Sequence, residues 1–317
     1  MIARQRLPAA ARLVALVGLL GGLAAVAVPS SGALGPSTCL GKTATIVGTD
    51  HHDRIKGTHH VDVIFAGGGG DVVIGRGGRD IICGGPGADK LIGSAGRQKL
   101  IGGPGRDWIK AYGGNDLLIG DRMALVGSVR GSAAHDVLRA GPGDDFVVGD
   151  NYSGLEARGG RPDRLLGANG HDILIGDSAA IGVGTATGGS GDKASGEGGH
   201  DLVIGDSFSP AGVASGAGND RLNGDHQGDL IVGDSFTRTG IARGRGGRDR
   251  VHGLWGDDDL HGDNFATRAR GRTRGGGKDV LNGAAGNDHL WGGPRHDICA
   301  GGPGRDHARE CEFRTSI

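Results

Sequence analysis

Apolar and polar residues follow each other along most of this chain in short runs of three, separated by glycine-rich turns. An aliphatic side chain stands at one fixed place in each run, and the first seven are Ile64, Val73, Ile82, Leu91, Leu100, Ile109 and Leu118. Runs this short, each with one inward apolar side chain, predict short β-strands. We therefore expect many small strands to coil around a shared interior.

The same stretch carries aspartate at a strict interval of nine residues. The series is Asp62, Asp71, Asp80 and Asp89, then Gln98 in place of one aspartate, then Asp107 and Asp116. Each unit has the order Gly-Gly-x-Gly-x-Asp-x-apolar-x, clearest in residues 84–92 and 102–110. Glycine takes positive φ without steric cost, so the first six residues suit a tight turn and the last three a strand.

This motif resembles the RTX, or hemolysin-type, calcium-binding repeat family, over about Asp53 to Asp306. The resemblance implies an all-β fold, a parallel β-roll or β-helix solenoid built from Gly-Asp-rich nonapeptide repeats. It also implies that successive nonapeptides form alternate sides of the roll. Calcium ions would then lie between turns that are two repeats apart.

Elementary electrostatics favours the same ion. Coils on one side would stack at about the strand spacing of 4.8 Å, and neighbouring ionised aspartates there repel by about 3 kcal/mol. A hard divalent cation converts that repulsion into attraction, and calcium accepts six to eight oxygens in a flexible geometry. The alternative is a metal-free solenoid in which aspartate only caps turns. The predicted calcium ligands are Asp62, Asp71, Asp80, Asp89, Asp107, Asp116, Asp136, Asp145, Asp163, Asp172, Asp192, Asp201, Asp220, Asp229, Asp249, Asp258, Asp279, Asp288, Asp297 and Asp306. Gln98 puts in doubt the sites that it would share with Asp80 and Asp116.

A longer unit of about 28 residues takes over after residue 120. Each unit holds two ordinary nonapeptides and an extra segment that begins with a Gly-Asp pair; these pairs end in Asp121, Asp150, Asp177, Asp206, Asp234 and Asp263. The extra segment is either a loop on a two-sided roll or a third side of a wider helix. Its aspartates either form a further ion-binding column or cap turns through hydrogen bonds to backbone N–H groups.

The two ends of the chain differ from the repeats. Residues 1–33 have a basic start followed by a short apolar run, which predicts a cleaved secretion signal and no membrane span in the mature chain. The four cysteines then lie in an oxidising compartment and allow three pairings. We expect Cys39 with Cys83 and Cys299 with Cys311, because each pair would tie one end of the solenoid. The expected regions are a signal at 1–33, a cap at 34–52, nonapeptides at 53–120, variant units at 121–278, and nonapeptides with a disulfide-tied cap at 279–317.

Composition narrows the function. Of 317 residues 70 are glycine and only 3% are aromatic, which does not suit a conventional globular core. The net charge of −1 argues against a nucleic-acid partner. No G-x-S-x-G, H-E-x-x-H or P-loop motif occurs, so we expect no enzyme.

We therefore expect a secreted, extracellular or cell-surface calcium-binding protein with a structural role and with multiple Ca²⁺ ions as its cofactors. The alternative is a cell-surface adhesion or polysaccharide-binding module, with a polysaccharide-acting enzyme as a further option. Phe208, Phe236 and Phe265 are the nearest approach to an aromatic ladder, although stacked Phe side chains more often pack than bind sugars.

Overall fold

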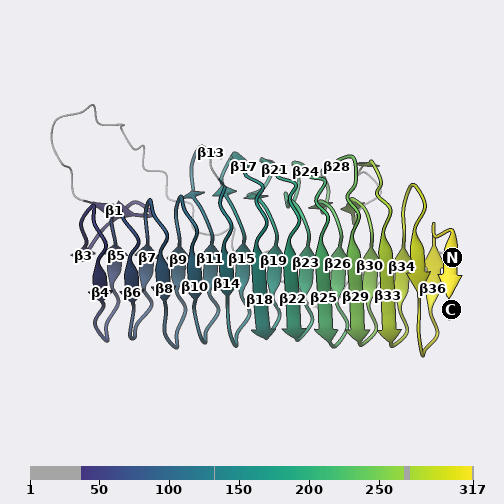
Figure 1. The fold of residues 1–317 in the computed structure, drawn as a ribbon, viewed down its shortest axis with the longest axis horizontal. Helices are drawn as coiled ribbons and strands as arrows, with labels where there is room; N and C mark the ends of the chain where they lie inside the picture. The colour runs from purple at the N-terminus through teal and green to yellow at the C-terminus, as the bar shows by residue number, and fades with distance from the viewer. Residues whose placement is uncertain (1–36, 132, 268–271, 316–317) are drawn as a thin grey trace.

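The computed structural model describes residues 37–131, 133–267 and 272–315, so the expected signal at 1–33 lies outside the described residues. These residues form strands and turns without a helix, and hence no helix among them could cross a bilayer. The strands stack into a long solenoid with the chain advancing one coil at a time along its axis (Figure 1). Each nonapeptide supplies only three strand residues. The sheets are therefore built from many short strands, one from each coil.

Two parallel sheets of twelve strands each form opposite sides of the roll. The first sheet contains β4 (Arg54–Lys56), β6 (Val72–Ile74), β8 (Lys90–Ile92), β10 (Trp108–Lys110), β14 (Val137–Arg139), β18 (Arg164–Asn169), β22 (Lys193–Gly198), β25 (Arg221–His226), β29 (Arg250–Trp255), β33 (Val280–Ala285), β35 (Ile298–Ala300) and β37 (Phe313–Thr315). The second sheet contains β3 (Ile46–Val47), β5 (Val63–Phe65), β7 (Ile81–Cys83), β9 (Lys99–Ile101), β11 (Leu117–Ile119), β15 (Phe146–Val148), β19 (Ile173–Ile175), β23 (Leu202–Ile204), β26 (Leu230–Val232), β30 (Asp259–His261), β34 (His289–Trp291) and β36 (His307–Arg309).

Strand register follows the sequence period. Leu91 pairs with Ile109 in the short coils, 18 residues on, and Leu165 pairs with Ala194 in the wide coils, 29 residues on. One apolar side chain per strand points inward and joins a single core that runs from Ile55 to Ala308. All seven positions of the first series are 0% exposed. The predicted parallel β-roll is therefore the observed fold.

The extra segments of the wide coils form strands of their own, on the outside of the second sheet. These outer strands are β12 (Met123–Ala124), β13 (Ser128–Arg130), β16 (Tyr152–Ser153), β17 (Glu156–Arg158), β20 (Ala179–Ala180), β21 (Thr185–Thr187), β24 (Val213–Ser215), β27 (Phe236–Thr237), β28 (Ile241–Arg243), β31 (Phe265–Ala266) and β32 (Arg272–Arg274). They pair in parallel with the same segment of the next coil, so the extra residues make a third side rather than a loop (Figure 1).

A second core lies between these outer strands and the second sheet. Ile119, Val148 and Ile175 point outward from the sheet and meet Tyr152 and Phe208 of the extra segments. Full burial of a side chain such as Phe208 contributes about 2 to 3 kcal/mol relative to an exposed one. The extra segment is thus held by packing of its own.

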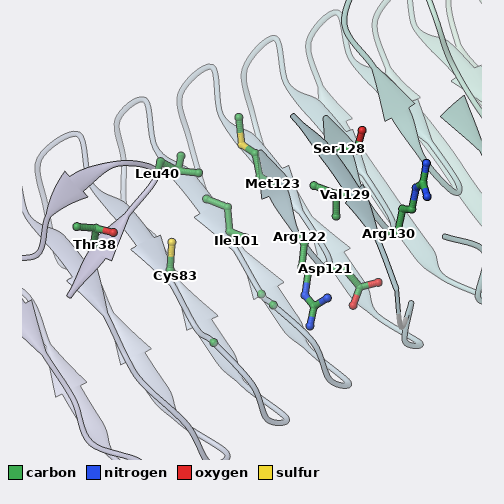
Figure 2. A pocket seen from close by; sticks show the side chains of 13 residues that line it. Thr38, Leu40, Cys83, Ile101, Asp121, Arg122, Met123, Ser128, Val129 and Arg130 are labelled. Atoms are coloured by element: carbon green, nitrogen blue, oxygen red, sulfur yellow. The ribbon is translucent and has the colours of Figure 1, made fainter. Parts of the chain in front are cut away.

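The N-terminal cap covers the outer face of the second sheet where no extra segment reaches it. Strands β1 (Thr38–Cys39) and β2 (Lys42–Thr43) form a small antiparallel pair, and Cys39 is bonded to Cys83 of β7. Within the segment predicted as a cap, β3 already pairs with β5, so the roll begins at Ile46. Between the cap and the first outer strands lies a groove of about 370 Å³, in which Ile101 faces Leu40, Met123 and Val129 (Figure 2).

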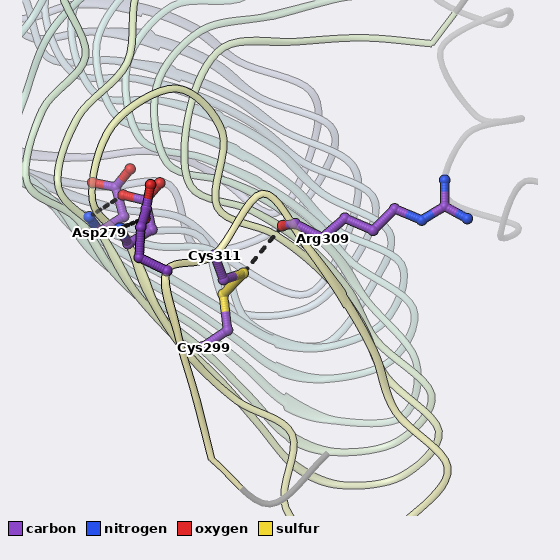
Figure 3. Close-up of a disulfide and its surroundings, with 6 residues drawn as sticks. Asp279, Cys299, Arg309 and Cys311 are labelled. Atoms are coloured by element: carbon purple, nitrogen blue, oxygen red, sulfur yellow. Dashed lines mark hydrogen bonds between the residues drawn. A yellow bond between two sulfur atoms is a disulfide. The ribbon is translucent and has the colours of Figure 1, made fainter.

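The C-terminal end is closed by the second disulfide. Cys299 occupies an inward core position of β35, where the repeat calls for an aliphatic residue, and is bonded to Cys311 (Figure 3). The sulfur of Cys311 also lies 3.1 Å from the carbonyl oxygen of Arg309. The two disulfides are the expected ones: Cys39–Cys83 ties the N-terminal end of the solenoid, and Cys299–Cys311 ties the C-terminal end.

Candidate metal centre

An acidic side chain precedes almost every strand of the roll, and the coils stack these side chains into two columns. The first Asp column, before the strands of the first sheet, contains Asp71, Asp89, Asp107, Asp136, Asp163, Asp192, Asp220, Asp249, Asp279 and Asp297. The second Asp column, before the strands of the second sheet, contains Asp62, Asp80, Asp116, Asp145, Asp172, Asp201, Asp229, Asp258, Asp288 and Asp306. None of the twenty is more than 8% exposed.

One oxygen of each carboxylate is used in a hydrogen-bond ladder along the column. The N–H of Asp89 donates to Oδ1 of Asp107 at 2.7 Å, and the N–H of Asp172 donates to Oδ1 of Asp201 at 2.8 Å. At the C-terminal end Glu312 replaces the next aspartate and accepts from the N–H of Asp297 at 2.6 Å. Nothing in the repeat motif points to Glu312, because the glutamate lies outside the nonapeptide period.

The other oxygen is left without a partner. Oδ2 is buried and makes no hydrogen bond in every column aspartate except Asp62 and Asp192. A buried polar atom without a partner costs about 1 to 3 kcal/mol, and more when it is charged. In the part of the chain that the structure describes, ion pairs are made by Glu156, Asp259 and Glu312, and none reaches a column aspartate. Among the described residues, therefore, no direct ion pair balances the charge of the columns.

The glycines of the turn keep the space around this oxygen small. A Cβ on Gly102 would lie 2.3 Å from Oδ2 of Asp107, and a Cβ on Gly87 would lie 1.5 Å from the carbonyl oxygen of Gly69 in the preceding coil. Only glycine lets carboxylate and backbone approach so closely. The motif thus surrounds each unpartnered oxygen with backbone, including carbonyl groups.

Carboxylate and carbonyl oxygens are the donors that calcium prefers. No three His, Cys, Asp or Glu side chains among residues 37–131, 133–267 and 272–315 converge on one point. A cation in the columns would therefore take further oxygens from turn carbonyls and water. The donor set fits calcium better than zinc, which selects nitrogen and sulfur.

Burial makes the columns costly when they are ionised and empty. Desolvation raises the pKa of Asp107 to about 10, with the nearby charge of Asp136 adding to the effect. Desolvation likewise raises the pKa of Asp172 to about 9 and that of Asp89 to about 6. Without a cation, the folded chain at neutral pH favours the protonated forms of Asp107 and Asp172.

The first coils give Oδ2 of their aspartates hydrogen-bond partners within the chain. Thr58 donates to Oδ2 of Asp62 through its N–H at 2.6 Å and its hydroxyl at 2.9 Å. Thr49 does the same for Asp53, at 2.6 and 2.8 Å. These two threonines stand four residues before the aspartate, where the typical turn has glycine. The start of the roll can therefore be stable without an ion.

Gln98 occupies the second Asp column and is fully buried. Its N–H donates to Oδ1 of Asp116 at 2.7 Å, but its own Oε1 is buried without a hydrogen-bond partner, so the ladder continues on one side only. Its side-chain amide donates to the hydroxyl of Ser94. Gln98 thus fills the place of an aspartate without its charge.

The Gly-Asp residues cap turns, as one of the two alternatives predicts. Asp206 accepts from the N–H of Gly218 and Asp234 from the N–H of Gly247, both at 2.9 Å. Asp121 accepts likewise from Ala134, Asp150 from Arg161, Asp177 from Ser190 and Asp263 from Gly277. This bonding uses one oxygen, and a second oxygen remains unpartnered in Asp121, Asp150, Asp206 and Asp263.

The aromatic ladder is a packing feature. Phe208 stacks on Phe236 and Phe236 on Phe265, with ring centroids 5.6 and 5.7 Å apart. Phe208 and Phe236 are each 2% exposed within the second core. They are not placed to bind a sugar at the surface.

Comparison with known protein families agrees with the geometry of the repeats. A scan against protein-family models matches the RTX calcium-binding nonapeptide repeat, described as four copies, at residues 57–91, 92–122, 128–151, 159–180, 213–239, 240–266 and 273–308. The chain belongs to this RTX repeat family. The matches cover more than half of the chain, and the RTX columns continue through the unmatched residues 181–212, where Asp192 and Asp201 keep the same ladder bonds. No curated protein matches the chain.

Proposed function

We propose that this RTX protein is a secreted, non-catalytic structural protein whose solenoid is stabilised by calcium bound along the two Asp columns. The observation that carries the proposal is the buried Oδ2 of 18 column aspartates, which has no hydrogen-bond partner. The family supports calcium as the ion. The proposed ligands are the twenty column aspartates, with Asp62 the weakest candidate because threonine already satisfies it.

Calcium would act here as part of the folding reaction. The metal-free roll must bury unpaired carboxylates and order many glycines, and glycine loses more backbone freedom on folding than any other residue. Binding energy at each site is then folding energy. A site saturated a hundredfold above its dissociation constant adds about 2.7 kcal/mol. Many such sites along one continuous core would give a transition between little structure in low calcium and a rigid solenoid in high calcium.

Secretion is supported by the two disulfides, which persist in oxidising compartments. An extracellular site also supplies calcium at the concentrations that weak repeats need. The non-catalytic role is supported by the burial of the acidic columns. Paired carboxylates that cleave a glycosidic bond must touch the sugar, whereas the column aspartates are at most 8% exposed.

Far-UV circular dichroism of the disulfide-intact protein, first stripped of metal and then titrated with calcium, tests the proposal. We expect β-structure to appear with calcium and magnesium to be much less effective, because magnesium demands a rigid octahedron. Equilibrium dialysis in parallel counts the bound ions. A protein that keeps its full β spectrum without metal and binds no calcium would refute the proposed function.

A further inference from the structure

The Gly-Asp residues form a third acidic column that runs beside the first Asp column in the wide coils. In each coil the residue two positions before the column aspartate donates its N–H to the Gly-Asp carboxylate; Gly218 does so for Asp206, two residues before Asp220. Asp206 and Asp220 are 0% and 1% exposed. Two buried carboxylates therefore flank the same turn.

One coil shows what fits between such a pair. The hydroxyl of Ser190 lies 2.8 Å from Oδ1 of Asp177 and 3.1 Å from both side-chain oxygens of Asp192. This hydroxyl bridges the Gly-Asp carboxylate and the column carboxylate. The space between the two acids thus accepts a small, positively polarised group.

In the next coil glycine stands where Ser190 stands, and no side chain bridges the acids. A Cβ on Gly218 would lie 1.9 Å from the carbonyl oxygen of Ser190, 2.7 Å from Oδ2 of Asp220 and 2.8 Å from Oδ1 of Asp206. Oδ2 of Asp206 and Oδ2 of Asp220 have no hydrogen-bond partner. Two kinds of hard oxygen donor, carboxylate and carbonyl, thus occur together at this turn.

We propose that Asp206 and Asp220 bind a calcium ion beside Gly218, at a site that the nonapeptide columns alone do not provide. The two carboxylates neutralise the ion, and the Ser190 carbonyl and water complete the six to eight oxygens that calcium takes. The inference deepens the proposed function and rests on it, because Asp220 also belongs to the first Asp column.

A route for the ion is present on the surface. A shallow groove of about 530 Å³ follows the glycines of successive coils, including Gly188, Gly216 and Gly244. A Cβ on Gly216 would lie 2.3 Å from Cβ of Asp206, so the Asp206 side chain lies directly behind that glycine.

The bridging serine provides a gain-of-binding test. Ser190→Gly removes the hydroxyl and recreates the arrangement around Gly218, so we expect one additional calcium per chain by equilibrium dialysis. Ser190→Ala is the matched control, because its methyl group still fills the space and should leave the count unchanged. Equal counts in Ser190→Gly and the parent protein, with both folded by circular dichroism, would contradict the proposal.

The converse variant is Asp206→Asn, which keeps an oxygen for the Gly218 N–H but loses the charge. We expect one calcium fewer per chain. Asp257→Asn, at an exposed turn residue, should lose no calcium. Asp172→Asn, in the second Asp column, should lose calcium from sites to which no Gly-Asp residue contributes. One outcome would refute this inference alone: Asp172→Asn lowers the number of bound calcium ions, whereas Asp206→Asn and Ser190→Gly leave it unchanged. In that case Asp206 and Asp220 would share a proton instead of an ion. A parent protein without bound calcium would refute the proposed function as well.

Discussion

Asp172 and Asp201 are 29 residues apart in the sequence, and the N–H of Asp172 donates to Oδ1 of Asp201 at 2.8 Å. The bond fixes the orientation of the Asp201 carboxylate and leaves its Oδ2 buried without a partner. The same carboxylate therefore has a structural oxygen and an oxygen free to bind an ion. A substitution that keeps the hydrogen-bonded oxygen but removes the negative charge separates the two roles.

Asp201→Asn is expected to weaken the calcium-dependent part of the stability. The amide oxygen can still accept from the Asp172 N–H, whereas the charge that holds the ion is lost. Loss of one site at a hundredfold excess of calcium over its dissociation constant lowers the free energy of unfolding by about 2.7 kcal/mol. Urea unfolding with and without calcium measures the difference, and exposed Asp257→Asn serves as the control. An equal loss of stability in both conditions would point to a purely structural role.

Gln98→Asp should act in the opposite direction. It completes the second Asp column between Asp80 and Asp116, so we expect at least one additional bound calcium and a higher melting temperature in calcium. In metal-free buffer the same change should destabilise the protein, because it adds a buried charge. Thermal melts in both buffers test whether the change in melting temperature is positive with calcium and negative without it. Gln98→Asn is the uncharged control. A variant that is less stable in both would show that the gap at Gln98 is not an unfilled ion site.

The nine-residue period predicted the inward residues, and the resemblance to RTX repeats implied the parallel roll whose alternate sides make two Asp columns. A strand of three residues has one inward position, so the aliphatic two residues after each aspartate had to form the core. The period also predicted which aspartates stack, because coils of equal length bring equivalent residues into register. Glycine at the turn could be anticipated for the same reason, since every coil must approach its neighbour closely.

The role of the extra segment could not be derived from spacing alone. Counting residues gives the length of an insertion and not its direction, so a loop and a third side remained equivalent. A signal was nevertheless present in strands such as Ile173-Leu174-Ile175, where all three residues are apolar and the outer two need a second core. The bridge made by Ser190 was invisible because Asp177 and Asp192 meet only after the chain has returned from the outer strands.

Two glycines with positive φ should respond very differently to substitution by alanine. Gly105 has φ +143° and a Cβ there would lie 1.6 Å from the carbonyl oxygen of Gly87, whereas Gly127 has φ +97° and no heavy atom within 4 Å. Gly127→Ala should cost about 1 kcal/mol for backbone strain alone. Gly105→Ala should cost at least about 2 kcal/mol more, since the coils must move apart. Chemical unfolding in calcium gives both values, and equal costs would contradict the close stacking of the turns.

The metal-free protein should become more stable as the pH falls, and calcium should reverse this trend. Burial raises the pKa of Asp172 to about 9 and that of Asp107 to about 10 in the folded chain, whereas an unfolded aspartate titrates near 3.9. Below about pH 4 both states are protonated and the acids impose no penalty. Between about pH 4 and 10 the folded state binds more protons than the unfolded state, so the free energy of unfolding decreases as the pH rises. With calcium bound the carboxylates are ionised, and acid must displace the ion. Urea unfolding at pH 5 and pH 8, after removal of metal on a chelating resin and again with calcium, measures both slopes. A metal-free protein that is more stable at pH 8 than at pH 5 would show that its columns carry no unpaired buried acid.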